Sequence, residues 1–356
     1  MRRLAAARQR GLSIVELMVG IVVSLLVGLA AAGSAMMFTA SQRQGIGVGG
    51  VAVNASTALA AVKNDIASTG LGFFGEAAYL CARLNMSNEA AVLIDNASFV
   101  PLRITEVGTN DSIDLLTASR IEAGANVLLA TPYNSGVDNK IQLVSYLPAN
   151  VGDAVLVSPK PPQETCVLRT VTKVTDSTDT SPQELEFDNS GGHNQAAFST
   201  PTSFGWESRA TLIGQMTWHR YRMDTAERTL LMERPILGDQ TVLARNVMAF
   251  RAQYGVSTAP GVDSLATWED ATGADFGNLG AAALPRVRAV RLGIVTRSPQ
   301  REKPDNMGVC RASDALPELF GEVIAPDVAD WQCYRFRVTT VVVPLRNLVY
   351  GLRKAP

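Results

Sequence analysis

The pattern of hydrophobic positions is dominated by an apolar run near the start of the chain, from Leu12 to Phe38. Its polar interruptions are Ser13, Glu16, Ser24 and Ser34. As a helix rising about 1.5 Å per residue, this run is about 40 Å long, which exceeds the roughly 30 Å hydrocarbon core of a bilayer. We therefore predict a membrane-spanning helix over residues 12–38.

Glu16 is the one charged residue in this run. An ionised side chain in a membrane helix costs about 2.5–3.5 kcal/mol on insertion scales, so a functional partner for Glu16 is expected. The simpler alternative is a plain single-pass anchor, in which an acid near the interface reaches towards water.

Four arginines and no acidic residue precede the run: Arg2, Arg3, Arg8 and Arg10. A basic segment before an apolar one predicts a cytoplasmic N-terminus and an exported remainder. An ordinary secretory signal cleaved near Ala35 is a competing interpretation. However, the apolar run is far longer than the roughly 7–15 residues of such signals, and it contains Glu16.

Helical periodicity continues beyond the membrane segment, with apolar residues at Leu59, Val62 and Ile66. This spacing predicts an amphipathic helix over residues 39–70 that packs one face on a globular body, with residues 63–65 facing away.

The two helical stretches are separated by a cluster of glycines: Gly45, Gly47, Gly49 and Gly50. Each glycine costs about 1 kcal/mol in a helix, so this cluster predicts a bend or a locally weak segment within one helix. A flexible linker is the alternative. Thr69 and the glycines that follow it are expected to end the helix.

From residue 71 the pattern changes to short strands separated by turn signals. The predicted strands are Ala91–Ile94, Ser112–Ala118, Asn126–Ala130, Lys140–Leu147, Asp153–Ser158, Thr165–Val174, Ala210–Asp224, Thr229–Glu233, Val247–Val256, Arg286–Thr296 and Cys333–Val343. We expect a β-rich globular head over 71–356, with subdomains at about 71–188 and 206–356 and a long loop at 189–205.

Composition narrows the choice of partners. The 356-residue chain has a formal net charge of −1, but without the four leading arginines the remainder carries −5. It has no basic run, so nucleic acid is not an expected partner.

The chain has four cysteines, an even number that suggests two disulfides in an exported protein, with three possible connectivities. The preferred pairing joins Cys310 to Cys333, which leaves Cys81 with Cys166. Buried free thiols are the alternative. The absence of a C-x-x-C pair makes a zinc site unexpected.

Catalytic signatures are missing: the sequence contains no Gly-x-Ser-x-Gly, His-Glu-x-x-His or phosphate-loop motif. Its two histidines, His193 and His219, offer few candidates for acid–base catalysis. We expect no catalytic residues, no cofactor and no metal. The acids at 263–275 could surround calcium, but their spacing fits no EF-hand.

Near its start the chain reads Arg10-Gly11 followed by Leu12-Ser-Ile-Val-Glu16. This segment resembles the processing site of type IV pilins and type II secretion pseudopilins. In that family a prepilin peptidase cuts after the glycine, the new first residue is N-methylated, and the fifth mature residue is glutamate. The resemblance implies a leader at 1–11, cleavage between Gly11 and Leu12, N-methylation of Leu12, and an assembly role for Glu16.

The rest of the chain contains a series of motifs, in this order: Asp65-Ile66 with Gly70 and Phe73, Gly152-Asp153-Ala-Val-Leu-Val157, Val247-x-x-Phe250-x-x-Gln253-Tyr254-Gly255-Val256, Val287-Arg-Ala-Val-Arg-Leu292 and Phe336-x-x-x-x-Val341-x-x-Pro344-Leu-Arg-Asn347. Together these motifs resemble the PilW type of minor pilin. The resemblance implies an α+β, pilin-like fold with a long N-terminal helix packed on a large antiparallel β-rich head. Pseudopilin J of type II secretion is a related family with a similar closing strand, but its members are usually shorter.

A minor pilin of this type would be a structural subunit, not an enzyme, that helps to initiate type IV pilus assembly and sits in the tip complex. Its partners would be other minor and major pilins, prepilin peptidase and the inner-membrane assembly machinery, and could extend to a tip adhesin. It would reside in the inner membrane with a periplasmic head before entering the extracellular pilus. The alternatives are a type II secretion pseudopilin and a membrane-anchored exported enzyme or binding protein.

Overall fold

We describe the chain from a computed structural model that covers residues 14–70, 73, 81–118, 126–160, 164–195, 197–280, 282–305, 307–326 and 328–353. The chain divides into two compact units, residues 1–50 and 51–356, and each is described by itself. The expected cleavage site at Gly11 and Leu12 lies outside the described residues.

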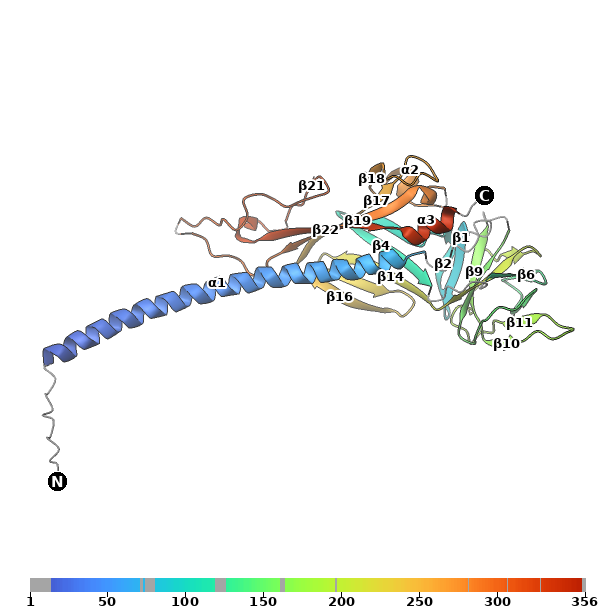
Figure 1. The fold of residues 1–356 in the computed structure, drawn as a ribbon, viewed down its shortest axis with the longest axis horizontal. Helices are drawn as coiled ribbons and strands as arrows, with labels where there is room; N and C mark the ends of the chain where they lie inside the picture. The colour runs from blue at the N-terminus through green and yellow to red at the C-terminus, as the bar shows by residue number, and fades with distance from the viewer. Residues whose placement is uncertain are drawn as a thin grey trace, which may run out of the picture. The chain divides into compact units, whose positions relative to one another are not determined.

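The first unit contains the start of helix α1, which runs from Ile14 to Ser68 and is blue in Figure 1. Its first 22 residues, Ile14–Ala35, have a mean hydropathy of 2.5 and are long and apolar enough to cross a membrane. The helix continues through the four glycines, and the division between the two units falls after Gly50. The bend expected at these glycines stays a prediction.

In the second unit, α1 buries the face that its periodicity predicts. Leu59, Val62 and Ile66 are all at most 3% exposed, whereas residues 63 and 64 face solvent. The expectation for Asp65 was wrong: it is half-buried, because two side chains of the head donate hydrogen bonds to its carboxylate.

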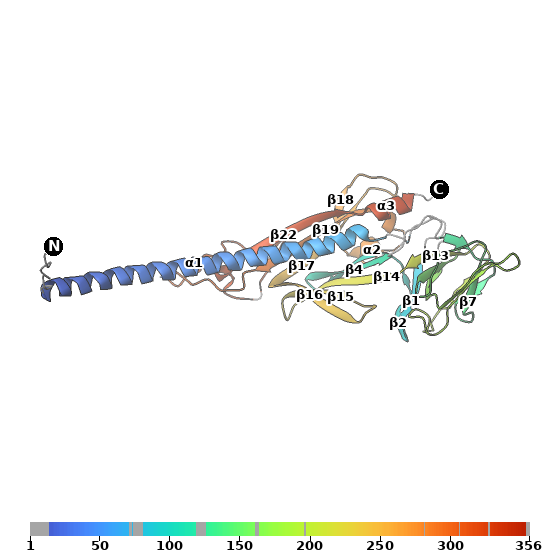
Figure 2. The same cartoon turned by 60° about the horizontal axis from the view of Figure 1, so that its bottom comes forward.

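Two antiparallel sheets pack around this part of α1. The five-stranded sheet has the order β16-β15-β14-β4-β3, and the four-stranded sheet has the order β18-β17-β19-β22. Their strands are β3 Leu102–Val107, β4 Asn110–Ala118, β14 Met216–Asp224, β15 Thr229–Arg234, β16 Asp239–Arg245, β17 Val247–Val256, β18 Thr267–Glu269, β19 Val287–Arg297 and β22 Phe336–Pro344. Figures 1 and 2 show β17, β19 and β22 side by side. One core cluster joins α1 to both sheets.

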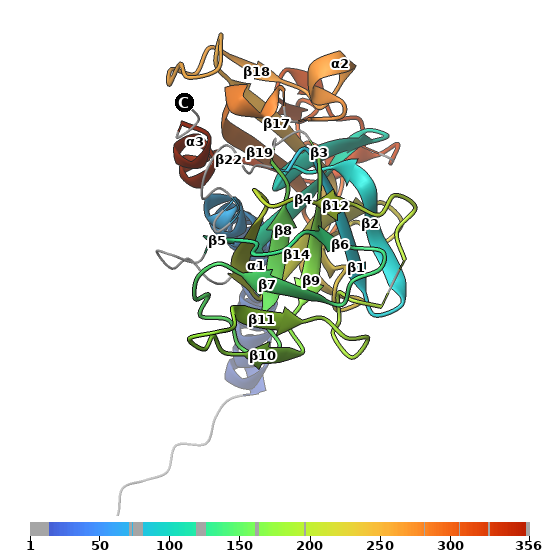
Figure 3. The ribbon, with the colours of Figure 1, turned by 90° about the vertical axis from the view of Figure 1, so that its right-hand side faces the viewer.

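A six-stranded sheet of order β2-β1-β9-β8-β13-β5 forms the rest of the head together with smaller sheets. Its pairs are antiparallel except β1 with β9. Its strands are β1 Arg83–Asn88, β2 Ala91–Ser98, β5 Asn126–Leu128, β8 Ala154–Ser158, β9 Thr165–Thr170 and β13 Arg209–Gly214. The smaller sheets pair β10 Lys173–Thr175, β11 Gln183–Glu186 and β7 Lys140–Leu143, and separately β12 Ser203–Phe204 with β6 Tyr133–Asn134. In Figure 3 the strands β7, β10 and β11 run across the view.

The remaining described elements are short. They are a hairpin of β20 Glu318–Leu319 and β21 Glu322–Val323, the helices α2 Gly273–Phe276 and α3 Arg346–Arg353, and 3-10 turns at Leu284–Arg286 and Trp331–Cys333. The expected α+β architecture, a long N-terminal helix packed on a large antiparallel β-rich head, is confirmed.

Most predicted strands are present, but two of them are each divided in two: Thr165–Val174 corresponds to β9 and β10, and Ala210–Asp224 to β13 and β14. Gly214 has a φ of 72°, a left-handed conformation that glycine adopts without steric cost, and here the chain leaves β13 before β14 begins. The strands that were not predicted are β1, β3, β6, β11, β12, β16, β18, β20 and β21, because each contains too few apolar residues to establish an alternation. The expected loop at 189–205 is irregular apart from the two residues of β12.

Candidate functional site

The first part of α1 presents apolar side chains on every side. Ile14, Leu17, Leu25 and Leu29 are 55–79% exposed within this chain. A helix that is hydrophobic all round requires a membrane or a surrounding bundle of helices rather than water. This segment is therefore the surface through which the chain would meet lipid or other helices.

Glu16 lies in the first turn of this helix and is the one ionisable residue in Ile14–Ala35. The serines in the segment do not need an external partner, because Ser24 Oγ donates to the carbonyl of Ile21 and Ser34 Oγ to that of Ala30, each at 2.9 Å. A carboxylate near a helix N-terminus is favoured by the helix dipole. In an apolar surrounding, Glu16 would bind a cationic group most strongly.

A second cluster attaches α1 to the five-stranded sheet. Asp65 accepts hydrogen bonds from His219 Nδ1 and, at 2.5 Å, from the hydroxyl of Tyr221, both on β14. Burial opposes ionisation of Asp65, but these hydrogen bonds outweigh it and lower its pKa. Burial and the neighbouring carboxylate raise the pKa of Tyr221, so its hydroxyl stays a donor. The sequence contained a signal for this contact, since Asp65 follows Val62 by three residues and so borders the buried face.

The end of α1 is also held by the last helix of the chain. Asn347 Nδ2, in α3, donates to the carbonyl of Ala67 at 3.0 Å. Leu345 and Leu348 on either side of it are buried in the core cluster that contains α1. The closing motif of the PilW resemblance thus folds back onto the helix that enters the head.

Residues of the central motif have structural roles in β17. Phe250 and Tyr254 are fully buried, and the hydroxyl of Tyr254 accepts a hydrogen bond from the backbone N–H of Ile104 in β3 at 2.5 Å. Gln253 accepts a hydrogen bond from Arg291 in β19. The Tyr254 contact joins the two sheets that surround α1, and the Gln253 contact joins two neighbouring strands of the four-stranded sheet.

All four cysteines form disulfides in the preferred pairing. The first disulfide joins Cys81 to Cys166, with a Cα–Cα distance of 5.5 Å, and the second joins Cys310 to Cys333, at 4.8 Å.

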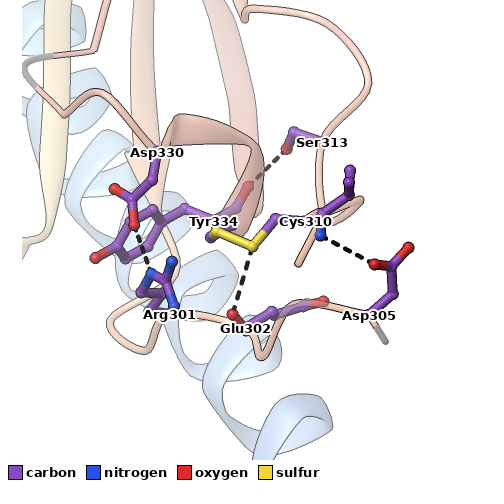
Figure 4. Close-up of a disulfide and its surroundings, with 9 residues drawn as sticks. Arg301, Glu302, Asp305, Cys310, Ser313, Asp330 and Tyr334 are labelled. Carbon is purple, nitrogen blue, oxygen red and sulfur yellow. Dashed lines mark hydrogen bonds and ion pairs between the residues drawn. A yellow bond between two sulfur atoms is a disulfide. The ribbon is translucent and has the colours of Figure 1, made fainter. Parts of the chain in front are cut away.

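The second disulfide closes a segment of the long connection between β19 and β22 (Figure 4). Arg301 pairs with Asp330 at 2.5 Å, and the hydroxyl of Ser313 donates to the carbonyl of Tyr334 at 2.7 Å. These polar contacts hold the connection in a defined conformation.

Among the described residues, no group of three or more His, Cys, Asp or Glu side chains is placed to hold a metal. Of the acids considered for calcium, Asp270 accepts a hydrogen bond from Gln253 at 2.6 Å, and Asp275 lies 3.4 Å from Arg286. Both histidines line one cavity of about 370 Å³.

Comparison with known proteins shows that the C-terminal part of the chain is similar to a known family. Residues 221–347, which run from β14 to α3, match the family model of type IV pilus-assembly protein W. No curated protein matches the chain. Among solved structures, a type IV-like pilin from Thermus thermophilus is similar at 11% identity, covering 83% of this chain and 96% of its own, with a TM-score of 0.36. The resemblance of this chain to PilW-type minor pilins is thereby confirmed, and it rests on residues 221–347.

Proposed function

We propose that this chain is a minor pilin, a structural subunit without catalytic activity that enters a type IV pilus through its N-terminal helix. The observation that carries the proposal is the pairing of two features. One is a helix that is apolar on every side except at Glu16. The other is a β-rich head whose C-terminal region matches the pilus-assembly family.

Assembly would proceed by exchanging lipid for other helices around residues 14–35. The helix keeps apolar contacts throughout this exchange, so the pairing of Glu16 would determine how neighbouring helices align. Cleavage after Gly11 would give Leu12 an α-amino cation, and the Glu16 carboxylate of a neighbouring subunit would neutralise it. Because a charge at the centre of a membrane helix costs about 2.5–3.5 kcal/mol and Glu16 lies in the first turn, pairing would favour one register of the incoming helix by at most about this amount.

A position at the pilus tip, with a role in initiating assembly, is the finer part of the proposal. The head of this chain occupies most of its 356 residues, and a bulky head is easier to accommodate at an end of a fibre than along its shaft. The four leading arginines favour an inner-membrane precursor with a cytoplasmic N-terminus and a periplasmic head. Other minor and major pilins, prepilin peptidase and the inner-membrane assembly machinery would be the partners, and a tip adhesin could join them.

The proposal is tested by mass spectrometry of the mature N-terminus, taken from membranes and from sheared surface fibres. We expect a peptide that begins at N-methylated Leu12. A Glu16→Ala variant should be processed but poorly incorporated into fibres, whereas the matched control Ser24→Ala in the same helix should assemble normally. A mature chain that begins at Met36, or that keeps its leader, would exclude the pilin mechanism.

Two further measurements address the position and the secretion system. Immunogold labelling of the head should mark fibre ends, and the copy number per fibre should not increase with fibre length. Deletion of the gene should abolish surface pili. Loss of enzyme secretion with intact pili would instead assign the chain to a type II secretion system.

A further inference from the structure

An arginine is buried in the head without an acidic partner. Arg169, on β9, is 5% exposed. It donates from Nε to the hydroxyl of Tyr133 at 3.1 Å, from Nη1 to the carbonyl of His193 at 3.2 Å, and from Nη2 to the carbonyl of Ser135 at 2.6 Å. Within the described part of the chain, no carboxylate forms an ion pair with it. A guanidinium has five N–H donors, so one on each terminal nitrogen is left over.

Arg169 lines a cavity of about 290 Å³, just below the range of roughly 300–1,000 Å³ usual for ligand pockets. Two loops form its walls. In one, the backbone N–H of Gly136 donates to Asn134 Oδ1 at 2.9 Å. In the other, Asn194 accepts from the backbone N–H of Thr170 and donates to its carbonyl, at 2.9 and 2.8 Å. These hydrogen bonds hold residues 134–136 of the first loop and residue 194 of the second against neighbouring backbone.

The rest of the lining is suited to a small polar ligand. Asn139, Asn189 and Gln195 present amide side chains for which the described residues provide no hydrogen-bond partner. Phe198 contributes an apolar wall, and the guanidinium of Arg169 lies 5.7 Å from its ring centroid. The site thus combines one buried cation, exposed amides and an aromatic face.

We propose that this cavity, formed by Arg169 and the loops at 134–139 and 189–201, binds the carboxylate group of a small polar ligand. A buried charge is costly unless it is paired, and a carboxylate offers two oxygens to the two remaining donors of the guanidinium. A phosphate dianion fits less well, because the site holds a single cation and Asp138 also lines it. Sugar acids and amino acids both carry such a carboxylate, and for an amino acid Asp138 would face the ammonium group.

The first experiment titrates the full-length chain in detergent micelles with sodium glucuronate and with glycine, followed by saturation-transfer NMR. The controls are the methyl ester of glucuronic acid and glycine amide, which lack the carboxylate. We expect saturable binding of at least one carboxylate and none of its control. Saturation by glucuronate assigns the site to a sugar acid, and saturation by glycine assigns it to an amino acid. The proposal is overturned if neither saturates, or if the controls bind equally well.

The second experiment assigns the binding to this cavity. Arg169→Lys keeps the positive charge but loses the planar guanidinium that can donate two hydrogen bonds to one carboxylate. It should weaken binding by about 10- to 100-fold. Gln195→Ala should weaken it by about two- to tenfold, while Gln240→Ala, which removes an exposed amide on β16, should have no effect. If Arg169→Lys fails to fold, the difference in ligand affinity between Gln195→Ala and Gln240→Ala decides whether the ligand binds in this cavity. Unchanged affinity in a folded Arg169→Lys, or equal affinities in the two glutamine variants, would refute the assignment.

Discussion

The cluster around Asp65 makes a specific prediction about how firmly the head holds its helix. Asp65 accepts hydrogen bonds from His219 and Tyr221, and a hydrogen bond to a charged group contributes about 1.5–3 kcal/mol. The Asp65 side chain is 30% exposed, and solvent weakens interactions with a charged group. We therefore take the contribution of each of the two hydrogen bonds from the lower end of this range. Because Tyr221 is fully buried, Asp65→Ala also leaves its hydroxyl with only a weak acceptor, the thioether sulfur of Met232 at 3.6 Å. We expect Asp65→Ala to reduce the free energy of unfolding by about 2–4 kcal/mol.

The pH dependence of this effect follows from the lowered pKa of Asp65. A carboxyl whose pKa is lower in the folded than in the unfolded state stabilises the fold above the unfolded value of about 3.9. That contribution is lost as the pH falls through the lower, folded-state pKa. Asp65→Asn keeps an acceptor for Tyr221 but cannot ionise. It should therefore be less stable than the native chain at pH 7 and should approach it below about pH 4.

Urea unfolding and amide hydrogen exchange of the full-length chain in detergent measure both effects. The neighbouring Asn64 is exposed, so Asn64→Ala is the matched control. In Asp65→Ala the amides of residues 53–68 should exchange faster than in this control. The reasoning would be wrong if the two alanine variants unfolded within about 0.5 kcal/mol of each other, or if exchange in this segment were unchanged.

Three other predictions concern the head. By chain-entropy estimates the first disulfide, with a sequence separation of 85, contributes about 4.6 kcal/mol, and the second, with a separation of 23, about 3.4 kcal/mol. Cys81→Ser should thus lower the urea midpoint more than Cys310→Ser. Burial raises the pKa of Asp111 to about 6, despite the nearby guanidinium of Arg251, so ionised Asp111 destabilises the fold at neutral pH. Asp111→Asn should be more stable than the native chain at pH 7, and urea titrations should show this advantage shrinking as the pH falls from about 6 to 4. Arg297 is 7% exposed, and two of its nitrogens lack a hydrogen-bond partner among the described residues. Arg297→Met should leave the thermal midpoint unchanged or raise it, and a fall of several degrees would contradict this.

The sequence predicted features that depend on local periodicity and could not predict those that depend on distant partners. Spacing alone placed Leu59, Val62 and Ile66 in the core, because a helix buries one stripe whatever lies opposite. It placed Asp65 wrongly, since the partners that draw this carboxylate inward lie more than 150 residues away.

The cavity around Arg169 was missed for the same reason. Its walls come from two loops that periodicity cannot describe, and the arginine looked like part of an ordinary apolar strand. A signal was nevertheless present: Arg169 is the one charged residue within Thr165–Val174 apart from Lys173 near the end. A single charge inside an otherwise buried strand is a reason to look for its partner.

The hydrogen bond between Asn347 and Ala67 links residues 280 positions apart, and it has a consequence for the order of folding. The ribosome produces Ala67 280 residues before Asn347. The amphipathic part of α1 therefore stays without its full set of packing partners until Leu345, Asn347 and Leu348 have been made. Such a high contact order predicts slow closure of the head. It also predicts that removing Asn347 and Leu348 would take one buried residue from the core cluster that contains α1, together with the hydrogen bond to Ala67. A nascent chain of this kind is expected to depend on chaperones until these residues are made.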